Sequence, residues 1–149
     1  MKPEMTRFME VAAKHLMTKT ASALAPGYEQ SSLLVFGVML GAVRHEFEHA
    51  AAWRVEENGA LRRLFAEAAP AVRATELGKR LEEAAAGEES SLIVSDLERS
   101  NAALRGLLID LHAHVEELDS PEARLIEEKI WRELAASTER RTLPLMGLA

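Results

Sequence analysis

Residues 94–118, VSDLERSNAALRGLLIDLHAHVEEL, contain the most regular hydrophobic pattern of the chain. Leucine recurs every seven residues, and a second series of mostly apolar residues lies three or four positions away from it. A repeat of seven residues places apolar side chains along one side of an α-helix. The members of the two series are Leu97, Leu104, Leu111 and Leu118, with Val94, Asn101, Leu108 and Val115. The pattern therefore predicts a long helix that packs against other helices.

Asn101 is the one polar residue of this repeat, and in coiled coils such a residue fixes register and helix number at some cost in stability. A DNA-binding leucine zipper is excluded because the preceding residues, EEAAAGEESS, are acidic where that class needs a basic region. Leu107 and Ile109 widen the apolar stripe beyond a two-helix seam. The pattern favours a helix in a bundle core over the alternative, a stand-alone two-stranded coiled coil.

Five prolines, at positions 3, 26, 70, 121 and 144, divide the chain into segments. Proline fits the first turn of a helix but disrupts a helix interior, so these positions separate helices. The segments are rich in Ala, Leu, Glu and Arg, and none alternates apolar and polar residues as a half-buried strand does. The helices predicted in this way cover residues 4–24, 28–69, 71–86, 92–118 and 121–141. Helix caps are predicted at Ser90 or Ser91 and within Asp119-Ser120-Pro121.

The predicted fold class is all-α: an antiparallel helical bundle of about five helices with one long central helix. At 149 residues the chain has the length of one ordinary domain, so a single all-helical domain spanning residues 1–149 is expected. A flexible C-terminal tail is expected at about residues 142–149. Within the long second helix, Asn58-Gly59 is the place where a kink or a stop can be expected.

The second helix also contains the most apolar segment of the chain. Gly37 and Gly41 form a G-x-x-x-G spacing, for which tight core packing is favoured over a dedicated dimerisation face. Residues 33–40, however, are apolar on nearly every side, and a helix of this kind must be covered all round. A chain of this size has few helices that can provide such cover. We therefore expect a homo-oligomer, most simply a two-fold dimer in which the long helices pair.

Composition and charge exclude several classes of protein. The net charge of −6 is spread without a basic block, so no nucleic-acid partner is expected. The absence of cysteine excludes disulfides and thiolate metal sites, so any metal needs histidine and carboxylate ligands. The longest apolar run, residues 31–43, is too short to span a bilayer, and the N-terminus does not have the pattern of a secretory signal. We expect no membrane association, and a cytoplasmic location follows by elimination.

His45-Glu46-Phe47-Glu48-His49 matches H-E-x-x-H, the pattern with which many zinc peptidases bind their metal. The two histidines lie on one side of a helix, and Glu46 can act as a general base toward a metal-bound water. A peptidase is disfavoured because positions 52 and 55 are Ala and Val, where the longer metzincin motif needs Gly and His, and because no sheet is predicted. Glu46 and His49 also form the E-x-x-H half-motif of di-iron bundles, but no second copy occurs.

Two interpretations of the histidine pair are left open. Helical spacing places Phe47 on an apolar stripe and both histidines on the opposite side of the helix. A structural role in packing or hydrogen bonding is favoured over metal binding by His45, Glu46 and His49. No cofactor is expected unless the second interpretation holds, and the cofactor is then a divalent ion of Zn, Fe, Mn or Ni.

Other candidate residues have simpler interpretations. His15 is expected opposite residue 37 if the first two helices fold back on each other, which makes it a poor third ligand for the pair. His112 and Glu116 are expected to form a local pair at i and i+4 rather than a ligand set. Trp53 and Trp131 are expected to be core or interface anchors.

Enzymatic chemistry has little support, since the chain has no nucleophile elbow, P-loop or Gly-rich dinucleotide turn. We expect a non-catalytic, homo-oligomeric interaction or accessory module that binds another protein. The alternative is a metal-binding helical bundle centred on His45, Glu46 and His49, either a metal-dependent hydrolase or an oxygen-handling protein.

Overall fold

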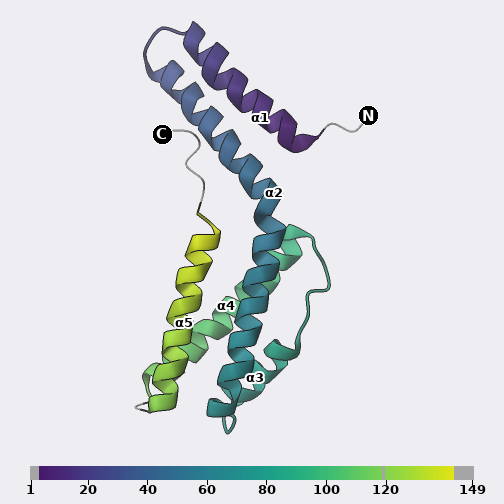
Figure 1. Ribbon diagram of the computed structural model, residues 1–149, viewed down its shortest axis with the longest axis vertical. Helices are drawn as coiled ribbons and strands as arrows, with labels where there is room; N and C mark the ends of the chain where they lie inside the picture. Colours follow the sequence, from purple (N-terminus) through teal and green to yellow (C-terminus); the bar gives the residue numbers. More distant parts are fainter. Residues whose placement is uncertain (1–3, 119, 143–149) are drawn as a thin grey trace. The chain divides into compact units, whose positions relative to one another are not determined.

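The computed structural model describes residues 4–118 and 120–142, and all regular structure within these residues is helical (Figure 1). The α-helices are α1 (Met5–His15), α2 (Tyr28–Ala68), α3 (Glu76–Ala86), α4 (Val94–Glu116) and α5 (Pro121–Arg140). Short turns of π- or 3₁₀-helix are η1 (Leu16–Thr20), η2 (Ala21–Ala23) and η3 (Ala69–Val72). The all-α prediction is confirmed for the described residues, and the predicted tail lies outside them except for Thr142.

Most helix ends fall close to their predicted positions. The helical run that begins with α1 continues through η1 and η2 to Ala23, and α2 extends for 41 residues without a break at Asn58-Gly59. Ser120 caps α5, because its Oγ accepts a hydrogen bond from the backbone N–H of Ala123 at 3.1 Å. The long second helix and the start signal before Pro121 are thus confirmed.

Two predicted helix starts are wrong. α3 begins later than expected, at Glu76, because the side chain of Thr75 provides its cap. The predicted serine cap of α4 is absent, and this helix begins at Val94 without a side-chain cap. The Oγ of Ser91 instead accepts a hydrogen bond from the N–H of Ile93 at 3.1 Å, ahead of the helix.

The chain divides into two compact units, and the boundary falls within α2. Residues 4–50 form the N-terminal hairpin, in which α1 runs antiparallel to the first part of α2 (Figure 1). Residues 51–118 and 120–142 form the C-terminal bundle, which contains the rest of α2 together with α3, α4 and α5. That all helices pack into one bundle, and that the chain is a single domain, stay predictions.

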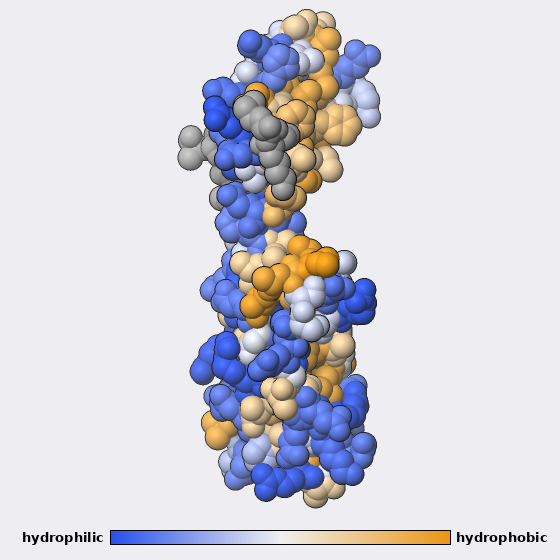
Figure 2. All heavy atoms as spheres, turned by 90° about the vertical axis from the view of Figure 1, so that its right-hand side faces the viewer, coloured by the Kyte–Doolittle hydropathy of each residue, from blue (hydrophilic) through white to orange (hydrophobic). Residues whose placement is uncertain are grey.

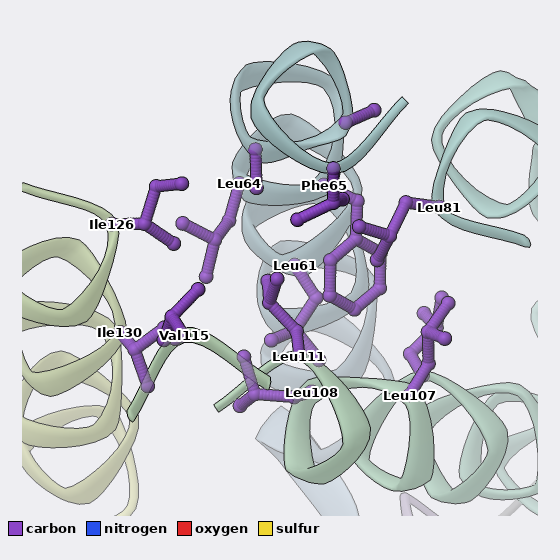
Figure 3. Packing of buried hydrophobic residues seen from close by; sticks show 14 of the residues in the cluster. Leu61, Leu64, Phe65, Leu81, Leu107, Leu108, Leu111, Val115, Ile126 and Ile130 are labelled. Carbon is purple, nitrogen blue, oxygen red and sulfur yellow. The ribbon is translucent and has the colours of Figure 1, made fainter. Parts of the chain in front are cut away.

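The hydrophobic core lies in the C-terminal bundle (Figure 3). Phe65 of α2, Leu81 of α3, Leu111 of α4 and Ile130 of α5 are each fully buried in it. Further members of this core are Leu61, Leu64, Leu104, Leu107, Leu108, Val115 and Ile126. Helices of the same chain therefore cover the α4 repeat from Leu97 to Val115, which confirms the bundle-core interpretation there, whereas its end members Val94 and Leu118 are 41% and 40% exposed. Ile109 was predicted to widen this buried stripe, but this prediction is wrong because 69% of the residue is exposed.

The N-terminal hairpin has no comparable core. Its buried residues are all small: Ala13, Ala21, Gly37, Gly41 and Ala50. A Cβ atom at Gly37 would overlap Cγ of Met17 and lie 3.3 Å from the carbonyl oxygen of Ala13. The glycine at this position therefore lets η1 and the end of α1 approach α2 closely, as the core-packing interpretation of G-x-x-x-G predicts.

Candidate functional site

The residues of the H-E-x-x-H pattern lie on the part of α2 that belongs to the N-terminal hairpin. His45 and His49 are half-buried, and their ring centroids lie 4.3 Å apart with the planes inclined by 35°. Nδ1 of His49 donates a hydrogen bond to the backbone carbonyl oxygen of His45 at 2.8 Å. Because a carbonyl oxygen only accepts, a neutral His49 ring has its proton on Nδ1, and Nε2 is the nitrogen with which it would bind a metal.

The structure brings the two histidines together, but the described residues place no third His, Asp or Glu ligand atom within 4.8 Å of both. Glu46, the predicted base, is exposed. Within the described ranges, the one set of three His, Asp or Glu side chains whose ligand atoms lie within 4.8 Å of one another is on α4 and α5. His15 is flanked by Ala13 and Met17, which pack at Gly37, and this agrees with its predicted position opposite residue 37. Metal binding by the H-E-x-x-H residues stays a prediction.

The N-terminal hairpin exposes much apolar surface, visible as orange side chains over its helices (Figure 2). Phe36, Met39, Val43 and Phe47 follow one another by three or four residues and form one stripe along α2, which we call the outer stripe. Each of these four side chains is more than half exposed. Ten Met, Phe, Leu and Val residues of the hairpin are exposed in all, namely Met5, Phe8, Val11, Leu34, Val35, Phe36, Val38, Met39, Val43 and Phe47. Phe36, Val43 and Phe47 of the predicted stripe are therefore exposed in the single chain, whereas Ala50 at its end is buried.

A buried carboxylate, Glu57, is the centre of a charged cluster in the C-terminal bundle. Only 2% of this residue is exposed, and its carboxylate accepts hydrogen bonds from Arg105 at 2.7 Å, from Ser137 at 3.1 Å and also from Arg141. Arg54 lies 3.4 Å from the same carboxylate. Burial alone would raise the pKa of Glu57, but the hydrogen bonds and the positive charges of Arg141 and Arg105 lower it below its ordinary value. Glu57 is therefore ionised inside the bundle.

Two buried amides extend this polar region between α2 and α4. Nδ2 of Asn101 donates to Oδ1 of Asn58 at 2.8 Å, and Nδ2 of Asn58 donates to Glu89 and to the carbonyl oxygen of Leu97. Asn101 is thus the polar core residue that the repeat predicts, with its partner in the same chain. The donor and acceptor atoms match only in one helix register, so the amide pair and the Glu57 cluster position α2, α4 and α5.

The sequence interpretation missed Glu57 and its partners, although one local signal points to them. Arg54, Asn58, Leu61 and Phe65 recur by three or four residues along α2, and Glu57 lies three residues after Arg54 and four before Leu61. The polar residues therefore continue the buried stripe of this helix. Charged residues in line with a buried stripe indicate an internal ion-pair cluster.

The predicted local pair on α4 is confirmed, since Nε2 of His112 lies 3.5 Å from Oε1 of Glu116. The rings of His112 and Trp131 pack edge to face, with their centroids 5.3 Å apart and their planes at 88°. Trp131 is 56% exposed, so it is not a core residue, and the predicted role as an interface anchor is the one left open.

Comparisons with known proteins were negative: no protein-family model, no curated protein and no solved structure matches this chain. Among the described residues, no helix combines the length and the apolar composition that a membrane span requires.

Proposed function

We propose that this chain is a non-catalytic homodimer that serves as an interaction or accessory module, and that two copies associate through their N-terminal hairpins. The observation behind the proposal is that the hairpin buries its small residues and exposes its large apolar ones. Glycine and alanine occupy its buried positions, whereas Phe, Met, Leu and Val side chains point into solvent. A helix pair with this distribution gains apolar burial only when another surface covers it.

The exposed apolar area of the hairpin is comparable in size with one side of a standard interface. Ten side chains that each expose about half of their surface amount to roughly 800 Å² of apolar area per chain, close to what one partner buries in a standard complex. The exposed residues of α2 are also free of charge over a long stretch, because no charged residue occurs between Glu29 and Arg44. Interface cores are depleted of charged residues in the same way.

A second copy of the chain is the occupant that fits this surface most simply. The outer stripe repeats by three and four residues over about three turns of α2, the spacing with which helices pack against like helices. Around a two-fold axis, two such stripes cover each other, and two hairpins supply the helices of a four-helix arrangement.

The oligomeric state of the full chain tests this proposal. Light scattering coupled to size exclusion should give twice the chain mass of 16.4 kDa at micromolar concentration. Val43→Glu places a charge in the outer stripe and should yield a monomer with unchanged helix content by circular dichroism. Leu125→Glu is the matched control, because Leu125 is an equally exposed apolar residue on α5. A monomeric wild-type chain, or equal disruption by both variants, would overturn the proposal.

Metal binding centred on His45, Glu46 and His49, in a hydrolase or an oxygen-handling protein, is the second candidate. The close approach of the two rings favours it, because one ion can join neighbouring imidazoles of this spacing. Elemental analysis of tag-free protein tests it, with His49→Ala as the control. Absence of stoichiometric Zn, Fe, Mn or Ni from the wild-type chain counts against this function.

A further inference from the structure

Three potential metal ligands converge where α4 ends and α5 begins. His112 and Glu116 come from the last two turns of α4, and Glu127 comes from the second turn of α5. One ligand atom of each residue lies within 4.8 Å of those of the other two, and Nε2 of His112 is 3.5 Å from Oε1 of Glu116. Small side-chain rotations bring three atoms at such distances onto one ion, which needs about 2.0–2.2 Å to each ligand.

The imidazole of His112 gives a second, independent observation. Its Nε2 atom is inaccessible to solvent and makes no hydrogen bond among the described residues, and the Glu116 carboxylate lies 3.5 Å from it without hydrogen-bond geometry. A buried polar atom without a partner is rare, because desolvation is then not compensated. The Trp131 ring, which packs edge-on with the imidazole, restricts the direction in which this nitrogen can point.

We propose that His112, Glu116 and Glu127 bind one divalent transition-metal ion. An imidazole and two carboxylates are ligands that Zn²⁺, Mn²⁺ and Fe²⁺ accept, and the ion neutralises the two carboxylates. The partial negative charge at the C-terminal end of α4 attracts a cation to the same place. Three protein ligands leave at least one position for water, and the ion joins α4 to α5 across the connection between them.

This site differs from the H-E-x-x-H pair and does not depend on dimerisation, because all three residues belong to the C-terminal bundle. The competing explanation is an ordinary ion pair in which a protonated His112 faces Glu116. The two explanations differ at Glu127, which is a ligand of the proposed ion but is not required for the pair.

Cobalt titration of the tag-free full chain distinguishes the two explanations. The chain has two tryptophans, so Trp53→Phe leaves Trp131 as the only one, adjacent to the proposed ion. Co²⁺ should quench the Trp131 fluorescence, saturate at one equivalent and give a visible d–d absorption band. Zn²⁺ added afterwards should reverse the quenching.

Conservative variants decide the assignment. His112→Ala and Glu127→Gln should each weaken Co²⁺ binding at least tenfold, while Glu128→Gln, an exposed neighbour on α5, should leave it unchanged. The double variant His45→Ala/His49→Ala should also leave it unchanged. Circular dichroism and the metal-free fluorescence of Trp131 check that each variant is folded. Undiminished binding by Glu127→Gln, loss of binding in the His45/His49 double variant, or quenching that never saturates would each overturn the proposal.

Discussion

Replacing Glu57 by Gln removes one negative charge from the interior of the C-terminal bundle while keeping the shape of the side chain. The carboxylate accepts hydrogen bonds from Arg105, Ser137 and Arg141, and only 3% of its side chain is exposed. After the substitution, the positive charges of these arginines face a neutral amide. The variant should therefore have a lower free energy of unfolding than the wild type.

The structure sets the size of this loss. Removing one partner of a buried ion pair costs about 3–5 kcal/mol, because the remaining charge is left buried and uncompensated. Arg105 and Arg141 are 42% and 36% exposed at their side chains, so water can partly replace the lost carboxylate. Arg54, which is only 10% exposed, keeps its bond to Glu98. We expect a loss at the lower end of the range, about 3 kcal/mol.

Glu56→Gln is the matched control, since it makes the same chemical change one residue earlier on the same helix. Glu56 pairs with Arg140 at 2.9 Å, but its side chain is 61% exposed. Exposed pairs contribute about 0–1 kcal/mol, so this variant should be nearly as stable as the wild type. Urea unfolding followed by circular dichroism, at one protein concentration, measures both variants. Equal losses for the two variants would refute the role assigned to the buried cluster.

The pH dependence of unfolding gives a second measurement of the same cluster. The pKa of Glu57 is lowered in the folded chain, so the unfolded chain binds a proton at this residue at a higher pH than the folded chain does. The stabilisation is complete above the unfolded pKa of about 4.3 and is lost as the pH falls through the folded pKa. The unfolding free energies of the wild type and Glu57→Gln should therefore converge below about pH 4. A constant difference down to pH 2 would contradict this assignment.

Two further pairs of variants test the core and the helix caps by the same unfolding assay. Phe65→Ala should cost about 3–5 kcal/mol, because Phe65 is fully buried, whereas Leu125→Ala at an exposed position should cost less than about 0.5 kcal/mol. A loss below about 1 kcal/mol for Phe65→Ala would mean that this core is loosely packed. Ser120→Ala removes the cap of α5 and should cost about 1 kcal/mol, while Ser90→Ala, at a serine that caps no helix, should cost a few tenths. Equal effects of the two serine substitutions would contradict the observed capping.

The features that could be predicted from the sequence depend on residues close together in the chain. Proline positions and strong helix formers give the helical class, and Ser120 with Pro121 gives the start of α5. The seven-residue repeat identifies Leu104 and Leu111 as buried, because helical geometry alone determines which residues share a side. Ile109 was assigned wrongly because a widened stripe does not reveal which edge of it the neighbouring helices cover.

The partners of the buried polar residues could not be predicted, because they are distant in sequence. Arg105 and Ser137, which bond to Glu57, lie 48 and 80 residues away from it. Glu127 reaches His112 only because α5 turns back beside α4. A single sequence shows the periodicity of each helix but not which helices face each other, so it indicates the polar positions without their partners.

The two parts of α2 differ in a way that indicates where along this helix self-association is expected. The sequence places its most regular pairing pattern on α4, but residues such as Leu111 in that pattern are already buried by helices of the same chain. The second part of α2 likewise directs Leu61 and Phe65 into this core. In the first part the arrangement is reversed, since Gly37 is buried whereas Phe36 and Phe47 are about 60% exposed, at 59% and 61%. Because association gains free energy only from apolar surface that is still exposed in the single chain, a dimer interface is expected on the outer stripe of α2 and not on the repeat of α4.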